Sequence, residues 1–433
     1  HAALFHKKAR IGNGGIQIRD VVKGINGGYR RPDGTVGTRN YLAVIPSVFC
    51  ANTTAQKIAA QIPGAVALTH CVGCSQVGLD LELTARTLKS MGCHPNAGAV
   101  LVIGLGCERF DPQELYDAVK ATGKPVAKFV IQEEGGVTNT VARAVEVGRE
   151  FARQLTMQQR VECPLGELMV ATKCGGTDAT SGLAANPAVG NMVDKVIAEG
   201  GSAILSELNE LLGTEKYLAK RAVNPQVAQK IYDAVYEIED VLRGGLDFSL
   251  PANRNHLISR GNFDGGVSSV VEKALGGVHK SGTAPFQDVL QYAVPPCKDQ
   301  KGLFLMDYES QDGEVVTGMI GCGSQIVAFT TGRGHATGHP LAPVLKITGN
   351  YKTYSSMREC FDFDASGVIS GEKTMEELGD ELLDLVIRVA SGEQTAAERL
   401  GGTELFCVAR RHGYHRKDPE ELRRHARECG ECE

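Results

Sequence analysis

The sequence predicts an α/β protein made of two consecutive βαβ-type domains with largely parallel sheets. Short apolar runs rich in β-branched residues alternate with longer helical stretches along most of the chain, a pattern typical of βαβ units. Several of these runs are apolar throughout, which indicates strands buried on both faces of a sheet. The length of 433 residues also exceeds that of one ordinary domain.

The first series of elements precedes residue 160. Its strands are short β-branched runs, and its last helix is long and amphipathic. In chain order we expect a strand at 41–46, a helix at 53–62, a strand at 97–105, a helix at 112–122, a strand at 125–131 and a helix at 137–155.

A second series follows Cys163-Pro164, and an amphipathic helix closes it. We expect strands at 168–172, 202–205, 302–306, 325–330 and 343–347, and helices at 187–199, 223–243 and 372–391. The two halves share an order of strand, cysteine loop and helix, which supports two related units. The resulting division is a tail or linker at 1–27, an α/β domain at 28–160, a second α/β domain at 161–410 and a basic C-terminal tail at 411–433.

Composition limits the classes of partner and compartment. The net charge of −5 is spread over both signs, which argues against nucleic acid and an anionic membrane as partners. No apolar run approaches the roughly 20 residues that span a bilayer, and no signal peptide opens the chain. The 13 cysteines are an odd number and too few for a disulfide scaffold. We therefore expect a cytoplasmic protein with reduced cysteines, most of them in the core.

Three cysteines are candidate metal ligands. Cys50, Cys74 and Cys107 each follow a predicted strand of the first series, so they are expected at one edge of one sheet. Three thiolates suit an iron–sulfur cluster with one open iron, or a single metal ion. Buried, unreactive thiols are the alternative. Cys71 and Cys74 can also form a metal knuckle or a redox pair.

Two residues are candidate general bases. His70 lies between an apolar run and the cysteine loop, and its intrinsic pKa is about 6.5. The alternative for this histidine is a buried side chain with satisfied hydrogen bonds. Lys173 follows the first strand of the second series and serves as a base if it is desolvated, or as an ion-pair partner if it is not.

Two loops can bind an acid group. The glycine-rich loop at 330–339 contains Thr331 and Arg333 and offers backbone N–H groups beside a guanidinium, a natural cradle for a carboxylate. Its glycine spacing is neither a Walker nor a Rossmann motif. Arg39 and Asn40 precede the first strand and pair a guanidinium with an amide.

Taken together, these motifs resemble the altronate and galactarate dehydratase family, over about residues 28–401. The matching segments occur in the same order along the chain. They are Gly28-Tyr-Arg-Arg-Pro-Asp-Gly-Thr-Val-Gly-Thr-Arg-Asn-Tyr41, Phe49-Cys-Ala-Asn52, Gly73-Cys-Ser-Gln76, His94-Pro-Asn96, Gly104-Leu-Gly-Cys-Glu108, Lys173-Cys-Gly-Gly-Thr-Asp178, Phe329-Thr-Thr-Gly-Arg-Gly334 and Phe361-Asp-Phe-Asp364.

The resemblance implies a lyase that dehydrates sugar acids to 2-keto-3-deoxy acids and requires iron, as a 4Fe–4S cluster or a single Fe²⁺. It also implies a small β-rich SAF domain, either as a missing N-terminal domain or as a separate subunit, and we expect a subunit in a homo- or hetero-oligomer. The large subunit of sulfolactate sulfo-lyase looks similar in the second half and is expected to lack counterparts of the three cysteines. Their presence here favours the dehydratase branch.

The expected mechanism places the open iron, held by the three cysteines, on the departing oxygen and the carboxylate. His70 or Lys173 removes the C2 proton. Arg39 and Arg333 clamp the carboxylate, and Asn52 and Gln76 meet hydroxyl groups. Three other readings stay open: a sulfo-lyase or a similar elimination on a short 2-hydroxy acid, a non-catalytic large subunit, and a redox protein.

Overall fold

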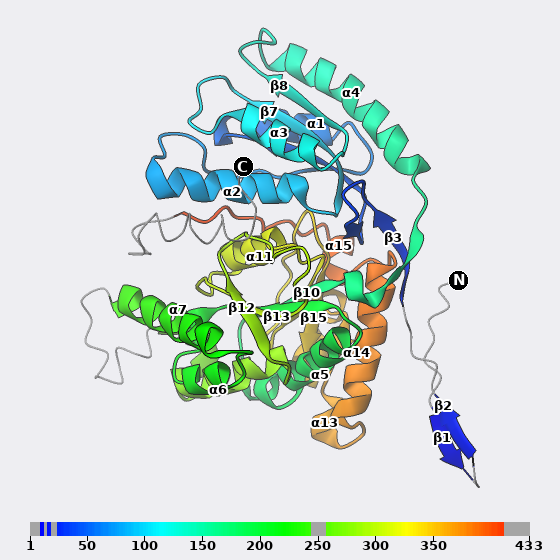
Figure 1. Ribbon diagram of the computed structural model, residues 1–433, viewed down its shortest axis with the longest axis vertical. Coiled ribbons are helices and arrows are strands. Elements are labelled where there is room, and N and C mark those ends of the chain that lie inside the picture. Colours follow the sequence, from blue (N-terminus) through cyan, green and yellow to red (C-terminus); the bar gives the residue numbers. More distant parts are fainter. Residues whose placement is uncertain (1–8, 13–14, 19–23, 244–256, 411–433) are drawn as a thin grey trace.

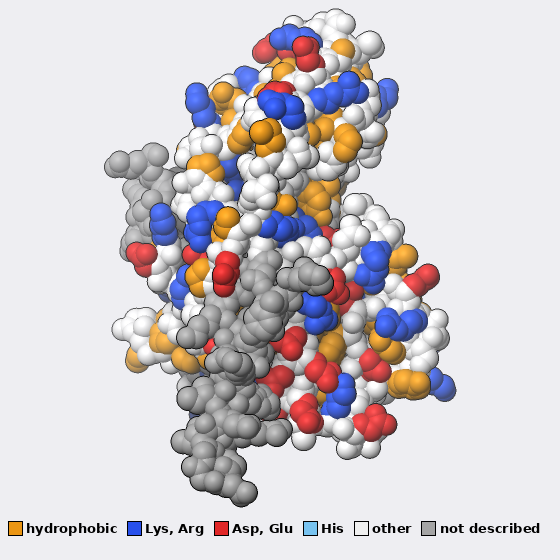
Figure 2. Space-filling model, turned by 90° about the vertical axis from the view of Figure 1, so that its right-hand side faces the viewer, with side chains coloured by type: hydrophobic (Ala, Val, Ile, Leu, Met, Phe, Trp, Pro, Cys, Tyr) orange, Lys and Arg blue, Asp and Glu red, His pale blue; other side chains and the backbone are white. Residues whose placement is uncertain are grey.

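The computed structural model describes residues 9–12, 15–18, 24–243 and 257–410, and it confirms the α/β fold class. Two α/β units lie one above the other (Figure 1). The face drawn in Figure 2 carries charges of both signs, with acidic side chains more frequent on the lower unit. Within the described residues, no helix is long and apolar enough to cross a membrane.

The first unit is a four-stranded parallel sheet in the order β6-β5-β7-β8 with two helices on each face. α1 and α4 pack together on one face, and α2 and α3 on the other. The strands are β5 (Tyr41–Pro46), β6 (Ala65–Ala67), β7 (Ala97–Gly104) and β8 (Val126–Val130). The helices are α1 (Asn52–Ala59), α2 (Gly78–Cys93), α3 (Pro112–Ala121) and α4 (Val137–Met157).

The second unit is a seven-stranded, wholly parallel sheet in the order β12-β13-β11-β10-β14-β15-β16. The chain leaves the central strand β10 toward β11 on one side and later returns to β14 on the other. The strands are β10 (Met169–Cys174), β11 (Ser202–Leu205), β12 (Phe286–Leu290), β13 (Gly302–Met306), β14 (Ile326–Thr330), β15 (Val344–Thr348) and β16 (Phe363–Asp364).

Helices cover both faces of this sheet. One face packs against α5 (Asn186–Ala198), α7 (Pro225–Arg243) and α14 (Met375–Ala390). The other face packs against α11 (Asp312–Gly321) and α15 (Ala396–Arg399). The remaining α-helices of the described residues are α6 (Glu215–Lys220), α9 (Arg260–Asp264), α10 (Val270–Gly277), α12 (Tyr351–Ser356) and α13 (Gly367–Ser370), with a π-helical turn at Ser181–Ala185 before α5.

A small antiparallel sheet joins the starts of the two units. β3 (Gly24–Arg30) pairs with both β4 (Val36–Gly37) and β9 (Val161–Pro164). Within the predicted tail at 1–27, β1 (Ala9–Gly12) pairs with β2 (Gly15–Ile18), and β3 begins at Gly24. β3 thus starts four residues before residue 28, where the first domain is predicted to begin. The predicted basic tail at 411–433 lies outside the described residues.

Two helices that the sequence pattern did not predict join the units. α2 of the first unit packs on α11 of the second, and one apolar cluster runs through both. Ser90 near the end of α2 lies against Gly321 at the end of α11. At the beginnings of these helices, Arg410 pairs with Asp80, and Cys407 lies against Gly313. The two helices therefore run in the same direction, and the carboxyl ends of both parallel sheets lie on the same side of the molecule.

Candidate active site

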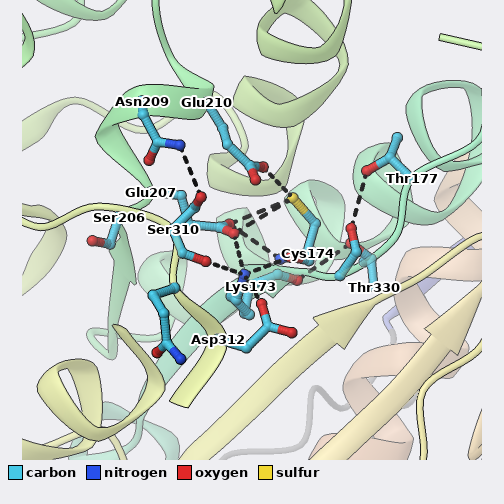
Figure 3. A network of polar contacts seen from close by, with 12 residues as sticks. Lys173, Cys174, Thr177, Ser206, Glu207, Asn209, Glu210, Ser310, Asp312 and Thr330 are labelled. Carbon is cyan, nitrogen blue, oxygen red and sulfur yellow. Dashed lines mark hydrogen bonds and ion pairs between the residues drawn. The ribbon is translucent and has the colours of Figure 1, made fainter. Parts of the chain in front are cut away.

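A buried cluster of charged side chains lies at the carboxyl end of β10 (Figure 3). Open α/β sheets bind ligands where the strand order reverses, and β10 is the strand beside that point. Strands β10 and β11, helices α10 and α11 and the turns that follow contribute to the cluster. Its members are Lys173, Cys174, Glu207, Glu210, Lys273, Lys280 and Asp312.

Lys173 makes more polar contacts than any other lysine of the cluster. Its Nζ lies 2.6 Å from Glu207 and 2.8 Å from Asp312, and it also donates to the carbonyl oxygens of Cys174 and Ser310. Burial acts to lower the pKa of Lys173, but the two carboxylates outweigh it and raise the pKa well above its ordinary value. Lys173 therefore stays protonated at neutral pH, and the structure favours the ion-pair alternative over a general base.

Glu207 holds the centre of the cluster in a strained backbone conformation. Its φ of 72° lies in the left-handed region, which a non-glycine residue enters at a cost of about 1–3 kcal/mol. Its carboxylate contacts Lys173, lies 2.5 Å from Lys280 and accepts the backbone N–H of Cys174 at 3.1 Å. Such strain is typical of functional sites, where the surroundings hold a residue in place.

Cys174 is a buried thiol between opposite charges. Its Sγ lies 2.8 Å from the ammonium of Lys280 and donates to Glu210 at 3.1 Å. Burial, together with Glu207 and Glu210, raises the pKa of the thiol to about 12. Cys174 is therefore a neutral hydrogen-bonding group at neutral pH, and not a thiolate nucleophile.

Part of this cluster has the ligand types of a metal site. Cys174, Glu207 and Glu210 each offer one ligand atom, and these atoms lie within 4.8 Å of one another. The group can therefore hold a metal ion. Lys280 and Lys273 already compensate its negative charge, however, so a divalent cation would have to displace at least one ammonium group.

The cluster reaches the surface through Asp312 and His335. Asp312 begins α11, and its second carboxylate oxygen lies 3.1 Å from His335 Nε2. Burial acts to raise the pKa of Asp312, but His335 and Lys173 outweigh it and keep the pKa well below its usual range. The hydroxyl of Thr337 lies 2.7 Å from His335 Nδ1. The imidazole is thus oriented from both sides while its side chain stays 23% exposed.

The glycine-rich loop places its two predicted residues differently. Thr331 is buried, and its hydroxyl donates to the carbonyl of Gly176, so it fixes the loop against the turn after β10. Arg333 is exposed beside that turn. Among the described residues, no hydrogen bond or ion pair engages its guanidinium, so Arg333 is available to a carboxylate.

The three predicted cysteine ligands lie on neighbouring loops at the carboxyl end of the first sheet. Cys50, Cys74 and Cys107 are all exposed and unpaired. The N–H of Phe49 donates to Val72, and that of Arg109 donates to Gly73, so backbone hydrogen bonds join the three loops. A side chain at Gly73 would collide with the backbone of Ser47 and Val48, so the loops approach as closely as glycine allows.

His70 and two amide residues hold these loops rather than pointing outward. His70 is buried: its Nε2 donates to the carbonyl of Pro46 at 2.7 Å, and its Nδ1 accepts the N–H of Val72. Both ring nitrogens are therefore in use, and burial lowers the pKa of His70 to about 4. The side chain of Asn52 pairs with the backbone of His70, and that of Gln76 with Gly73 and Thr84. The structure thus favours the satisfied, buried histidine over the general base.

Arg39 and Asn40 lie at the opposite edge of the sheet from the cysteines, because they precede β5. All five N–H groups of Arg39 donate to protein acceptors, two of them to Glu398 at 2.7 and 2.8 Å. Asn40 accepts from Arg31 and donates to Leu155. The prediction that these two residues bind substrate conflicts with this geometry: Arg39 joins the first unit to the second, and Asn40 holds α4 against the segment before β5.

Sequence reasoning missed most of the buried cluster. Glu207 and Glu210 directly follow the strand predicted at 202–205, so the rule that selected the cysteine loops also applied to them. Asp312 was missed because α11 is buried almost throughout and has no polar stripe to reveal it. Lys280 lies far from any predicted strand end.

Two family models match the chain. The second domain of D-galactarate dehydratase/altronate hydrolase matches residues 28–156, and the C-terminal domain of D-galactarate/altronate dehydratase matches residues 165–412. These two segments lie on either side of the start of β9.

Individual relatives agree with this match. The chain is 39% identical to (2R)-sulfolactate sulfo-lyase subunit beta of Chromohalobacter salexigens over 387 residues, which cover 88% of this chain and 96% of that subunit. It is 34% identical to altronate dehydratase of Bacillus subtilis, over 87% of this chain and 76% of that enzyme. It is 33% identical to galactarate dehydratase (L-threo-forming) of Escherichia coli, over 85% and 73%. The match to the sulfo-lyase subunit covers 88% of this chain, so it extends into the first unit as well as the second half where similarity was expected.

Proposed function

This chain belongs to the D-galactarate/altronate dehydratase family and is a lyase, and we propose that it removes water from a sugar acid to leave a 2-keto-3-deoxy acid. The observation that carries the proposal is the cluster around Lys173 and Glu207 at the switch point of the second sheet. Burying charged groups costs several kcal/mol per ion even after relaxation, and the strained φ of Glu207 adds to that cost. A structure keeps such an arrangement where chemistry needs it.

The residues around the cluster have separate roles in this reaction. Arg333 binds the substrate carboxylate, since it is exposed and lies beside the turn that follows Lys173 and Cys174. His335, oriented by Asp312, gives a proton to the hydroxyl that leaves C3. Lys173 and Lys280 stabilise the negative charge that develops on the substrate when its C2 proton is removed.

Iron fits the first unit by the chemistry of its donors. Cys50, Cys74 and Cys107 present exposed thiols from three loops that share backbone hydrogen bonds, and thiolates hold iron–sulfur clusters. We propose that these cysteines hold a cluster or a single ferrous ion at the edge on the same side as the buried cluster. When bound, iron with an open coordination position supplies a Lewis acid to the substrate oxygens.

We also propose that the active site includes residues from a second polypeptide or a further domain. The relative from Chromohalobacter is named subunit beta, and the match covers 96% of it. The two dehydratases extend beyond the match by about a quarter of their length. We propose that a small subunit or a further domain completes the site on the side where both strand-end edges open.

A second candidate activity is the release of sulfite from sulfolactate. The identity of 39% to the sulfo-lyase subunit, against 33–34% for the two dehydratases, favours testing it. Both reactions remove a proton from C2 of a 2-hydroxy acid and break a bond at C3. They differ in the leaving group, because hydroxide needs a proton to depart as water and sulfite does not.

The test is an assay of anaerobically purified, iron-loaded protein with altronate, galactarate and (2R)-sulfolactate as separate substrates. Formation of a 2-keto acid is followed as its semicarbazone, and sulfite by its reaction with a chromogenic disulfide. The proposal is supported if wild type dehydrates one of the sugar acids and the turnover of Lys280→Met does not exceed the background rate. Sulfite release without dehydration selects the second activity. Equal turnover by wild type and Lys280→Met, on any of the three substrates, overturns the site.

A further inference from the structure

Three side chains stand side by side across the second sheet below the site. In the register of the strands, Lys173 on β10 is opposite Phe329 on β14, which is opposite Lys346 on β15. The ring of Phe329 lies between the two lysines, with its centroid 5.8 Å from Lys173 Nζ and 3.8 Å from Lys346 Nζ. The two amines thus share one layer of one sheet face.

The two lysines differ in their polar partners. Lys346 is fully buried, and its Nζ has no hydrogen-bond partner within the described residues. The other lysines with less than a tenth of their surface exposed each contact at least two oxygen or sulfur atoms. They are Lys124, Lys173, Lys273 and Lys280. A buried amine without an acceptor is much less costly when it is neutral.

The groups around Lys346 set the pKa of its amine near neutral pH. Burial is the main cause that lowers the pKa of Lys346 to about 7, and nearby Lys173 lowers it further. Asp312 on α11, Asp362 before β16 and Glu404 on the C-terminal segment act in the opposite direction. The lone pair of the amine is therefore available at neutral pH, unlike that of Lys173.

We propose that Lys346 is the general base that removes the C2 proton of the substrate, an inference that rests on the proposed lyase function. His70 has both nitrogens engaged, and Lys173 stays protonated, so neither earlier candidate can fill this role. Phe329 also packs on His335, at 4.9 Å between ring centroids. Phe329 therefore contacts both the amine of Lys346 and the imidazole of His335, and the proposal requires this ring to rotate before a substrate reaches the amine.

The proton and electron balance of the step is complete. The amine of Lys346 takes the C2 proton and becomes an ammonium group, and the C2–H electron pair forms the C2–C3 double bond. The C3–O bond breaks, and the hydroxide leaves as water with a proton from His335. The enol then loses its hydroxyl proton and gains one at C3, which yields the 2-keto acid. Lys346 and His335 return to their starting states by exchange with the solvent.

The experiment compares Lys346→Met with Lys352→Met, a matched change at an exposed lysine on α12. In wild type and Lys352→Met, kcat/KM should fall about tenfold per pH unit below about 7. Lys346→Met should lose roughly 10²–10⁴ in kcat, with a KM near that of wild type, and should stop the exchange of C2 deuterium. Normal kcat, or exchange that persists in Lys346→Met, overturns the assignment.

A second measurement separates this proposal from the proposed function. The protein is labelled with ¹³C at lysine Cε, and its NMR spectrum is titrated, with Lys346→Met identifying the resonance. A pKa near 7 supports an accessible lone pair even if none of the three hydroxy acids is a substrate, in which case only the proposed function fails. A pKa near 10 overturns Lys346 as the base whatever the substrate is.

Discussion

The carboxyl-end edges of the two sheets differ in how they expose their polar side chains. The edge of the first sheet presents Cys50, Cys74 and Cys107 as exposed thiols on loops tied together by backbone hydrogen bonds. The edge of the second sheet buries Lys173 and Glu207 completely. The first edge exposes its thiols to the solvent, and the second holds its charges in a fixed, buried arrangement. The same topological position can therefore carry either exposed side chains or a buried polar network.

The largest expected effect comes from breaking the buried edge. Lys173→Met leaves Glu207 and Asp312 without their shared cation, so the free energy of unfolding should fall by about 3–5 kcal/mol. Turnover should fall roughly 10²-fold or more. Chemical denaturation and the dehydration assay measure the two effects.

Lys195→Met is the matched control for that change. Lys195 also pairs with two carboxylates, but its side chain is 20% exposed. Because exposed pairs contribute about 0–1 kcal/mol, this variant should be nearly as stable and as active as wild type. An equal loss of stability in both variants would mean that burial of the edge does not matter.

The difference between the edges also shows which parts of the molecule are visible in a sequence. The strands of both sheets carry continuous apolar runs, so the fold class and the positions of the cysteine loops could be predicted. The role of Arg39 could not be predicted. The sequence around an arginine is the same whether its guanidinium binds substrate or pairs with a residue distant in sequence, such as Glu398. Glu207 and Lys280 meet only because β11 and the turn after α10 come together in the tertiary fold. The periodicity of apolar residues in the sequence does not predict this contact.

Arg39 and Arg333 were both predicted to bind the substrate carboxylate, and the same substitution should affect them differently. Arg39→Lys loses two of five donors in a buried setting, which should cost about 1–3 kcal/mol of unfolding free energy and leave KM unchanged. Arg333→Lys should leave unfolding unchanged and raise KM about tenfold, which corresponds to 1.4 kcal/mol. Denaturation curves and steady-state kinetics distinguish them. A raised KM in Arg39→Lys would restore this residue to the substrate site.

The dependence of stability on acid pH tests the role of His70, which holds the cysteine loops of the first sheet in place. The pKa of His70 is lowered to about 4 in the folded protein, against about 6.5 when unfolded. As pH falls below 6.5 the unfolded chain takes up the proton and the folded chain does not, so stability is lost progressively down to about pH 4. Between pH 6.5 and 5, His70 should account for about 2 kcal/mol of this loss.

Replacing His70 by Gln removes the titrating group while keeping a donor. The difference in unfolding free energy between wild type and His70→Gln should therefore shrink by about 2 kcal/mol between pH 6.5 and 5. The measurement is denaturation at both pH values in the same buffer ions. A constant difference would show that His70 takes up its proton equally in the folded and the unfolded protein, and that its Nδ1 does not keep the N–H of Val72 as a donor at low pH.

The smallest expected change in stability comes from the exposed edge itself. Cys50→Ser, Cys74→Ser and Cys107→Ser remove thiols that are exposed and make few contacts, so each should change the unfolding free energy of the metal-free protein by no more than about 0.5 kcal/mol. If the three act as one ligand set, each single change should nevertheless reduce bound iron several-fold, and Cys71→Ser should not. Iron and acid-labile sulfide are measured on anaerobic preparations of all four variants. Unequal losses among the three would separate a shared cluster from a site built on fewer cysteines, because a cluster that needs three corners is lost equally when any one of them is missing.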